Sequence, residues 1–346
     1  MNRRYLKLIL AVTIAAVAQS KSASAQNGRQ SLSQEPACQT LTPAAVGGPM
    51  PKDPNVIVVR WLGHTNYELA YRDSVVLMDA YYDRVPRSHP IGVVPKDFKR
   101  ANAIFIGHAH FDHMSDAASV AKQTGATVIG ASFGTGVVRQ FGVPDKQIKT
   151  VVGQRGEVAE FRGFTAQPVL GHHNVIATTV PAGYLDKAET AMTAASLQEP
   201  LTDAEKQHAD VIRSRGSRDA KIAIEGTIGY LFTFGSNFRV MVVDSPGPIT
   251  EAQRQVMQQI PNVDVAMLPL VNMDAGLPPL VELVKLFKPG TVFLGHHDGP
   301  GTMRWTSTFL AATAIRDALP KTQTMDVLYR TPVCFNTTTK EMLVGY

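Results

Sequence analysis

The chain has few cysteines, no cluster of basic residues and no long apolar run after its N-terminus. Each of these absences excludes a class of protein. Only two of its 346 residues are cysteines, which excludes a disulfide-dense scaffold and a thiolate-rich zinc site. Basic residues are scattered, and four of the basic residues behind the net charge of +5 lie in the first 25 positions, so we expect no nucleic-acid partner. No apolar run after the N-terminus is long enough to cross a bilayer, so we expect no transmembrane anchor.

The N-terminus has the pattern of a cleaved secretory signal. Three basic residues precede a short apolar run, and Ala23-Ser24-Ala25 supplies a small-x-small cleavage site. We therefore predict that residues 1–25 are removed and that the mature protein is periplasmic or secreted, through the Sec or the twin-arginine route. Residues 26–55 are rich in Gly, Pro, Ser, Gln and Thr, which predicts an extended N-terminal arm.

The two cysteines lie far apart, Cys38 in the arm and Cys334 near the last strands. Export implies an oxidising compartment, so we predict a disulfide that holds the arm against the C-terminal part of the chain. Two separate thiols, one buried and one in the arm, are equally compatible with the sequence.

The strongest pattern is the run from His108 to Asp112 and His113, which places three imidazoles and one carboxylate within six positions after the apolar stretch 103–107. Imidazole and carboxylate are the ligands that zinc and similar divalent metals prefer. Alternate residues of an extended segment point the same way, so His108 and His110 can converge on one ion. The following turn can bring Asp112 and His113 to a second ion. The sequence therefore predicts a metal site rather than a polar turn.

The pattern His-x-His-x-Asp-His after a hydrophobic strand resembles the signature of the metallo-β-lactamase superfamily of dinuclear metallohydrolases. This resemblance implies an α/β fold, an αββα sandwich of two mixed β-sheets flanked by helices, over residues 56–346. It also implies a third histidine for the first metal, an aspartate that bridges the metals, and a last histidine for the second metal, each at a strand end. In this chain those positions match the doublet His172-His173, Asp244, and the doublet His296-His297.

Each histidine doublet leaves the choice of ligand open, because adjacent residues of a strand point to opposite faces. In the resembled enzymes the ligand is often followed by a bulky or polar residue that lines the pocket. That resemblance favours His172 and His296 as ligands, with His173 and His297 facing the substrate. A place beside the ligands, or an ordinary loop position, is the alternative for the second member of each doublet.

Two upstream segments resemble the branch that contains ascorbate-6-phosphate lactonase and N-acyl phosphatidylethanolamine phospholipase D. Gly63-His64-Thr65 is similar to its Gly-His-(Ala/Thr) entry, and residues 75–79 are similar to its second strand, which ends in an aspartate. We interpret Asp79 as a carboxylate that orients a metal-bound imidazole, and His64 as part of the pocket wall. A polar residue at a strand end is the alternative for both.

Periodicity and turn signals predict alternating strands and helices. Strands are expected over residues 56–61, 66–70, 75–78, 103–106, 127–130, 157–161 and 164–170, a hairpin over 228–234 and 238–243, and helices over 116–123, 251–259, 280–287 and 307–318. A polar, alanine-rich insertion is expected from about 185 to 220, with helices over about 187–197 and from the capping box at Thr202 to Arg215. Because it opens beside His172, we predict a mobile lid or pocket wall that selects substrate; a surface excursion without a role is the alternative.

The ligand set implies two divalent metal ions, zinc by default with manganese or iron as alternatives. With Asp112 as the catalytic carboxylate, the predicted function is a secreted hydrolase of a small molecule. It would use a hydroxide activated by two metals to cleave an ester, lactone, amide or phosphodiester. Alternatives are a secreted metal-binding protein of this fold without turnover, and a diiron redox protein. Neither cysteine stands at the second metal, unlike in many zinc β-lactamases, so antibiotic hydrolysis is less expected. The sequence leaves the substrate and the oligomeric state open.

Overall fold

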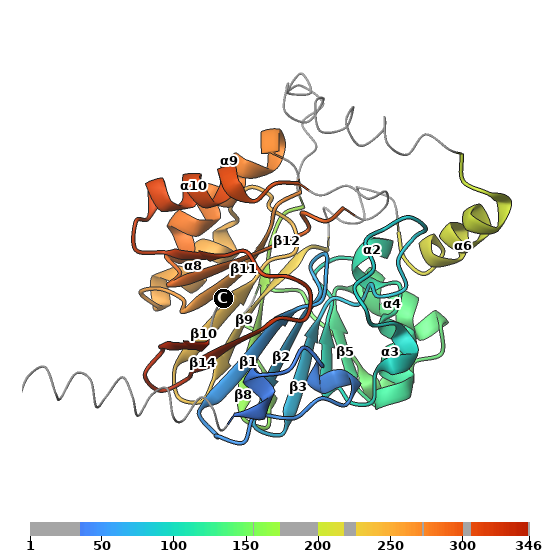
Figure 1. The fold of residues 1–346 in the computed structure, drawn as a ribbon, viewed down its shortest axis with the longest axis horizontal. Helices are drawn as coiled ribbons and strands as arrows, with labels where there is room; N and C mark the ends of the chain where they lie inside the picture. The colour runs from blue at the N-terminus through green and yellow to red at the C-terminus, as the bar shows by residue number, and fades with distance from the viewer. Residues whose placement is uncertain are drawn as a thin grey trace, which may run out of the picture.

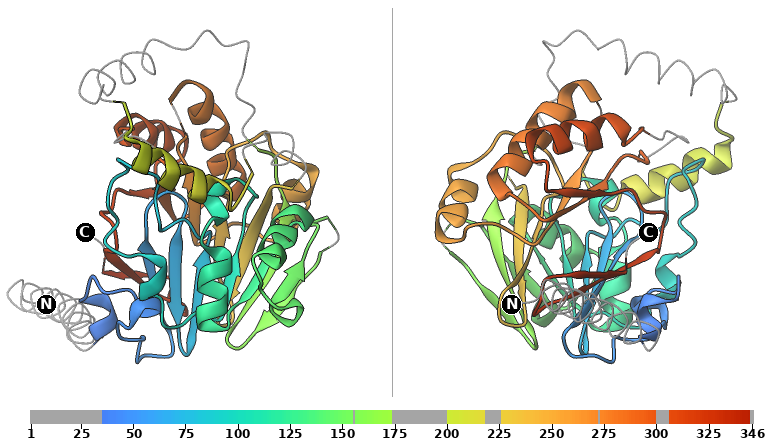
Figure 2. Two further views of the ribbon diagram at one scale, coloured as in Figure 1. Left: turned by 90° about the vertical axis from the view of Figure 1, so that its right-hand side faces the viewer. Right: turned by 60° about the vertical axis from the view of Figure 1, so that its left-hand side comes forward.

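Two mixed β-sheets face each other in the computed structural model, and helices cover their outer faces (Figures 1 and 2). The structure describes residues 35–154, 156–173, 200–217, 226–271, 273–299 and 306–344. The layers follow the αββα order that the sequence predicts. The predicted signal peptide and the predicted helix over 187–197 lie outside the described residues.

The first sheet has eight strands in the order β15-β14-β1-β2-β3-β4-β5-β6. They are β1 Val56–Trp61, β2 Tyr67–Tyr71, β3 Ser74–Met78, β4 Ala103–Phe105, β5 Thr127–Gly130, β6 Ile148–Thr150, β14 Pro332–Asn336 and β15 Met342–Val344. Strands β1 to β3 form an antiparallel meander, whereas β3 to β6 pair in parallel. The carboxyl ends of β3, β4 and β5 therefore meet at one edge.

The second sheet has seven strands in the order β13-β12-β11-β10-β9-β8-β7. They are β7 Ala159–Phe161, β8 Phe164–Leu170, β9 Ile228–Phe234, β10 Phe238–Val242, β11 Val265–Pro269, β12 Thr291–Gly295 and β13 Gln323–Met325. The predicted hairpin forms β9 and β10. From β10 to β13 the strands pair in parallel, which gathers their carboxyl ends at one edge.

Aromatic and branched side chains fill the space between the sheets, because each inner face of the strands is apolar. Trp61, Phe105, Tyr230, Phe232 and Phe293 are all essentially buried there. A second apolar cluster lies between the second sheet and its helices, and a third lies on the outer face of the first sheet. The sandwich is thus a rigid support for loops at the strand ends.

Helices on the first sheet are α2 Phe111–Met114, α3 Ala117–Thr124 and α4 Ser132–Gln140, and those on the second are α8 Glu251–Gln259, α9 Met273–Phe287 and α10 Phe309–Ala318. The sequence did not predict α4, which contains two glycines and no start signal, and its burial of Val138 against the sheet stabilises it instead. Helix α9 begins seven residues before the predicted start and includes Pro278 and Pro279. Within the described ranges, no helix is both long and apolar enough to cross a membrane.

The part of the N-terminal arm that begins at Glu35 packs on the first sheet. It forms the 3-10 turns η1 Pro36–Cys38 and η2 Ala44–Val46. A disulfide joins Cys38 to Cys334, which confirms the predicted pairing. The arm also covers a buried ion pair of 2.9 Å between Arg60 and Glu68. The Glu68 carboxylate accepts hydrogen bonds from the backbone of η2, and Arg60 donates to the carbonyl of Ala37.

Candidate metal centre

Gly107, two residues after the end of β4, permits a close approach between the two sheets. A Cβ atom at Gly107 would collide with the carboxylate of Asp244, which follows β10 of the opposite sheet. Gly107 also donates its N–H to Asp79 Oδ1 at 3.0 Å. Directly after it, His108 is buried, with Nδ1 2.6 Å from Asp244 Oδ2 and Nε2 3.0 Å from His110 Nδ1. The two imidazoles of the His-x-His pair therefore converge, as predicted.

The short helix α2 turns the next two candidate ligands toward the interior. His110 is its N-cap residue, and Asp112 and His113 lie buried in its single turn. Nδ1 of His113 lies 2.8 Å from Asp79 Oδ2 and 2.9 Å from the hydroxyl of Thr65, which itself donates to Asp79 at 2.6 Å. These contacts engage one ring nitrogen of His113 and orient the ring.

Three sets of side chains come close enough to hold metal ions, with their candidate ligand atoms within 4.8 Å of one another. We call His108, His110 and His173 the first centre. The second set consists of Asp112, His113 and His296, which we call the second centre, together with His64. The third set is His108, His113 and Asp244. The third set shares His108 with the first centre and His113 with the second. Asp244 therefore lies between the two centres, where the resemblance places a bridging aspartate.

The structure brings His173, and not the preferred His172, close to His108 and His110. His172 is exposed, whereas the half-buried His173 ring lies 4.8 Å from that of His108 and 4.9 Å from that of His110, measured between centroids. The reason is that β8 ends at Leu170, so the alternation of a strand no longer governs the doublet. Its carbonyls instead pack against Gly247 of the loop after β10, where a Cβ would collide with them.

In the second doublet, His296 lies among the candidate ligands as predicted, whereas His297 does not take its predicted position. His296 joins the second centre, with its ring centroid 5.6 Å from that of His113. It has a φ of 62°, in the left-handed region, and its N–H donates to the His64 carbonyl at 2.7 Å. His297 does not face a pocket as predicted: it is buried, and its ring stacks on Trp61 at 4.5 Å. The left-handed backbone at His296 redirects the chain, and the ring of His297 enters the core.

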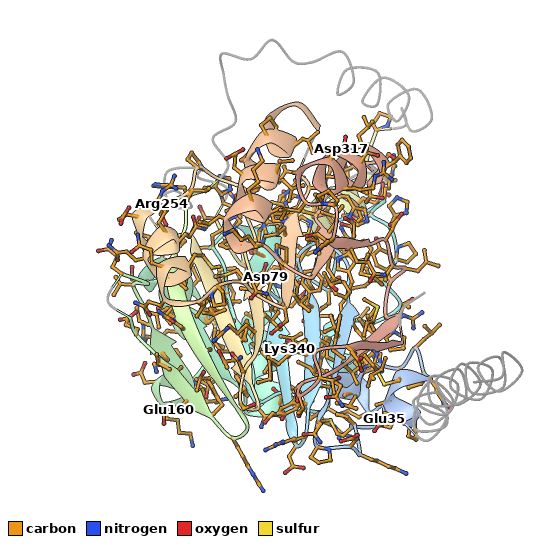
Figure 3. All side chains as sticks on the ribbon, turned by 90° about the vertical axis from the view of Figure 1, so that its left-hand side faces the viewer. Glu35, Asp79, Glu160, Arg254, Asp317 and Lys340 are labelled. Carbon is orange, nitrogen blue, oxygen red and sulfur yellow. A yellow bond between two sulfur atoms is a disulfide. The ribbon has the colours of Figure 1, made fainter. Side chains whose placement is uncertain are left out.

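Asp79 is fully buried after β3, in the interior of the molecule (Figure 3). Its carboxylate contacts the ring of His113, as the predicted orienting role requires. His64 is fully buried, and a nitrogen of its ring lies within 4.8 Å of the candidate ligand atoms of Asp112, His113 and His296. Sequence reasoning missed Thr65, although it stands in the Gly-His-Thr motif, and Asp298, although it directly follows the second doublet. Asp298 is buried and accepts hydrogen bonds from the backbone N–H of His64.

Burial and neighbouring charge shift the pKa values of the carboxylates in opposite directions. Burial, together with the negative charge of Asp244, raises the pKa of Asp79 well above its ordinary value. Burial alone would also raise the pKa of Asp112, but contact with His64 and the nearby His296 and His108 lowers it below the ordinary range. Asp112 is therefore ionised at neutral pH, as a ligand or proton acceptor must be.

The imidazoles of the second centre are in the form that binds metals. Burial, followed by the charges of neighbouring histidines, lowers the pKa of His113 well below its ordinary value. Burial and His64 do the same for His296. Both rings are therefore neutral at pH 7, with a lone pair available.

The residues fit divalent metal ions. Among the described residues, Asp244 Oδ1, His296 Nδ1 and both ring nitrogens of His64 are buried without a hydrogen bond. Buried polar atoms are rarely left in this state, because they lose their interactions with water. The carboxylates of Asp79, Asp112 and Asp244 are crowded together beside neutral imidazoles, so a cation would compensate both their charge and the unsatisfied atoms.

Comparison with known proteins agrees with this geometry. Residues 75–317 match the family model described as the Beta-lactamase superfamily domain, and the chain belongs to that superfamily, which confirms the predicted resemblance. A "UPF0173 metal-dependent hydrolase" of Roseiflexus sp. is 27% identical over 150 residues, covering 39% of this chain and 58% of that relative. A protein of the same description from Pyrobaculum islandicum is 33% identical over 92 residues, or 26% of this chain and 39% of the relative. The matches thus span from about two fifths to under two thirds of these relatives' lengths.

Solved structures show the same fold at low sequence identity. Igni18, described as a novel metallo hydrolase from Ignicoccus hospitalis, has a TM-score of 0.54 and 16% identity, covering 81% of this chain and 98% of that one. CmlA, a diiron β-hydroxylase from Streptomyces venezuelae, has a TM-score of 0.52 and 14% identity, covering 83% of this chain and 55% of that one. Likenesses at this identity establish the αββα fold and leave the chemistry to the site itself.

Proposed function

We propose that the protein is a metal-dependent hydrolase that binds two divalent metal ions and cleaves an ester, lactone, amide or phosphodiester bond of a small molecule. The observation that carries this proposal is the convergence of two sets of imidazole and carboxylate ligands on either side of Asp244. The descriptions of the relatives as metal-dependent hydrolases support it.

His108, His110 and His173 would hold one ion, and Asp112, His113 and His296 would hold the other, with Asp244 close to both sets. Divalent ions bound there would polarise the scissile carbonyl or phosphoryl group and lower the pKa of a water molecule toward ~7. The predominance of imidazole favours zinc, with manganese or iron as alternatives.

The chain's own residues would position the reactants. Asp112 is ionised, so it can accept a hydrogen bond from the attacking water and take up its proton, which is then available to the leaving group. Asp79 and Thr65 hold the ring of His113, and therefore fix the second centre against rotation of this ligand. The absence of a side chain at Gly107 lets Asp244 lie against the loop of the first centre.

The end of the insertion is attached to the loop that carries the ligands, which supports a role as a pocket wall. Helix α6 Asp203–Arg213 begins at the capping box predicted at Thr202, and lies beside α2 over the strand ends (Figure 2). Beyond it, Ser217 donates its N–H to the Ala109 carbonyl at 2.8 Å and accepts from the Phe111 N–H at 3.0 Å. These two bonds flank His110, so the insertion and the first centre share one backbone junction.

Replacing Lys187–Arg213 with a short Gly-Ser bridge tests this role while keeping Ser217. We expect unchanged metal content and an altered order of preference among substrates, because the ligands stay but one wall of the pocket is removed. Unchanged kinetics over a substrate panel would show that the insertion selects nothing.

We also propose that the mature protein is periplasmic or secreted after removal of residues 1–25. The disulfide between Cys38 and Cys334 supports this, because such bonds persist in oxidising compartments. Mass analysis of the protein recovered from each cell fraction tests it: we expect the mature mass outside the cytoplasm, and a full-length cytoplasmic product would contradict it.

Elemental analysis and a substrate panel together test the central proposal. We expect two transition-metal ions per chain, turnover of at least one class among lactones, chromogenic phosphodiesters and β-lactams, and loss of that turnover after chelation. One ion or none in metal-replete protein would contradict the dinuclear site. Two ions without turnover on broader panels would favour a metal-binding protein, and bound iron with oxygen-dependent redox chemistry would favour a diiron protein.

A further inference from the structure

His64 is buried at the candidate metal centre, and its ring makes no hydrogen bond of good geometry to any described residue. It lies in the turn between β1 and β2, and its side chain has no solvent exposure. Both Nδ1 and Nε2 are buried without a hydrogen-bond partner in the part of the chain that the structure describes. A neutral imidazole needs one donor and one acceptor partner, so a ring left in this state indicates a ligand that completes it.

One of these two nitrogens, Nε2, faces the second centre. Nε2 of His64 lies 3.3 Å from Asp112 Oδ2, and the His64 ring centroid lies 3.7 Å from that of His296 and 4.9 Å from that of His113. Two ligand atoms that each lie ~2.0–2.2 Å from one ion are about 3–3.5 Å apart, depending on the coordination angle. The separation between His64 and Asp112 falls within that range.

The backbone holds His64 in an unusual conformation. Its φ is 51°, in the left-handed region that non-glycine residues rarely adopt. Its N–H donates to both carboxylate oxygens of Asp298 at 3.0 Å, and its carbonyl accepts from Trp61 Nε1 at 2.7 Å and from the His296 N–H at 2.7 Å. The last bond joins the backbones of two histidines whose rings lie side by side. Surroundings that over-determine an unfavourable conformation in this way are typical of functional positions.

Asp298 is itself fixed from two further directions. Arg84 Nη1 donates to Asp298 Oδ2 at 2.6 Å, and the hydroxyl of Tyr329 donates to the same oxygen at 2.7 Å. Asp298 and Arg84 are both buried at this contact. A charged network thus positions the backbone of His64, while the ring of His64 itself makes no hydrogen bond within the described chain.

We propose that His64 is a ligand of the second metal ion, in addition to Asp112, His113 and His296. This inference rests on the proposed metal centre and extends it to three imidazoles and one carboxylate, with Asp244 shared. A donor set richer in nitrogen favours zinc over manganese at this position. The competing role for His64 is to donate a hydrogen bond from Nε2 to Asp112, and so to position that carboxylate without touching a metal.

Metal titration of chelator-treated protein separates the two roles, with zinc as the probe. We expect wild-type protein to bind two zinc ions, and both His64→Ala and His64→Gln to bind the second ion about 100-fold more weakly with the first unchanged. Glutamine keeps an N–H donor but is a poor ligand for zinc, so it tests for the ligand role. The matched control is His172→Ala, an exposed histidine next to the first centre, which should bind both ions as wild type does.

The outcomes distinguish this inference from the proposed function. Wild-type protein that binds no zinc would contradict the metal centre as a whole. Two tight ions in wild type, His64→Ala and His64→Gln alike would overturn only the role of His64. Normal affinity in His64→Gln with loss in His64→Ala would assign His64 as a hydrogen-bond donor to Asp112.

A measurement on wild-type protein keeps the test independent of how the variants fold. Cobalt(II) is loaded into protein that contains ¹⁵N-labelled histidine, and NMR counts the imidazoles with large contact shifts, which require a direct bond to the metal. We expect the second ion to add three such imidazoles to those of the first centre. An increase of two would overturn the proposal.

Discussion

The two histidine doublets place their members in opposite order. In His172-His173 the second ring joins a candidate ligand set and the first residue is exposed, whereas in His296-His297 the first ring joins a candidate ligand set and the second enters the core. The difference comes from the backbone at each strand end. His172 lies two residues beyond β8, while His296 directly follows β12 with a left-handed φ of 62°. Side-chain alternation predicts direction only inside a strand.

The spare member of each doublet differs as well. His172 contributes an exposed ring, whereas His297 is stacked on Trp61 at 4.5 Å and is 2% exposed. The segments that follow also differ: the first doublet leads toward the insertion, and the second is followed by the buried Asp298–Arg84 pair. Substituting the spare member should therefore have little effect in the first doublet, whereas it should lower stability in the second.

The largest expected effect separates the two members of the first doublet. His173→Ala should bind the first ion weakly and lower kcat/KM by ~10³-fold or more, because the metal contributes several kcal/mol to transition-state stabilisation. His172→Ala should stay within about twofold of wild type, since its ring is exposed. Steady-state kinetics on the best substrate, with metal analysis, measures both. The reverse ranking of the two variants would contradict the placement of His173.

The second prediction concerns the carboxylate that belongs only to the second centre. Asp112→Asn should keep the first ion, because His108, His110 and His173 are unchanged, yet lower kcat by ~10²–10³-fold through loss of the proton acceptor. Metal stoichiometry and kcat are measured on the same preparation. Near-normal turnover would show that Asp112 is assigned wrongly.

The spare members should differ in stability. His297→Ala should lower the free energy of unfolding by about 2–3 kcal/mol, because it removes a buried ring from its stack on Trp61. His172→Ala should change it by less than ~0.5 kcal/mol. Denaturant unfolding of the metal-free proteins measures the difference without a contribution from metal binding. Equal stability of both variants would mean that the stack contributes nothing.

The smallest expected effect lies in the insertion after the first doublet, where Glu205 of α6 pairs with Arg87 at 3.0 Å. The hydrogen bond from Arg87 lowers the pKa of Glu205 from 4.5 to about 2. The pair therefore stabilises the docking of α6 above about pH 4.5, and this contribution is lost as the pH falls through about 2. In the Glu205→Gln variant, hydrogen exchange at pH 7 should be slightly faster for the backbone amides of α6 than in wild type.

Asp210→Asn is the matched control, because it removes a carboxylate of the same helix whose contact with Arg213 is longer, at 3.7 Å. Its α6 amides should exchange as in wild type. If Glu205→Gln also exchanged as wild type at pH 7, the Arg87 pair would have no role in holding the insertion.

Much of the fold follows from local patterns. The capping boxes at Thr202 and Thr250 begin α6 and α8 at the predicted residues, because a side-chain oxygen and a backbone N–H three residues apart form the same bond wherever a helix begins. Helix α4 gave no such signal, and packing on the sheet decides it. The sequence also predicts the wrong start for α9, because Pro278 and Pro279 favour a helix boundary while the helix in the structure includes both.

By itself, the sequence determined which ligand types are present and in what order they occur. The six residues from His108 to His113 are contiguous, so one strand end and one helical turn are enough to bring them together. The sequence was compatible with a Cys38–Cys334 disulfide and with two separate thiols, and the structure contains the disulfide.

Only the tertiary structure decided which ring of each doublet turns inward, and that His64 lies among the candidate ligands. These directions depend on backbone angles set by hydrogen bonds between distant segments, such as the bond from His296 to the carbonyl of His64. A local pattern encodes the period of a strand or helix, but it carries no information about the partner that holds a residue beyond the end of that element.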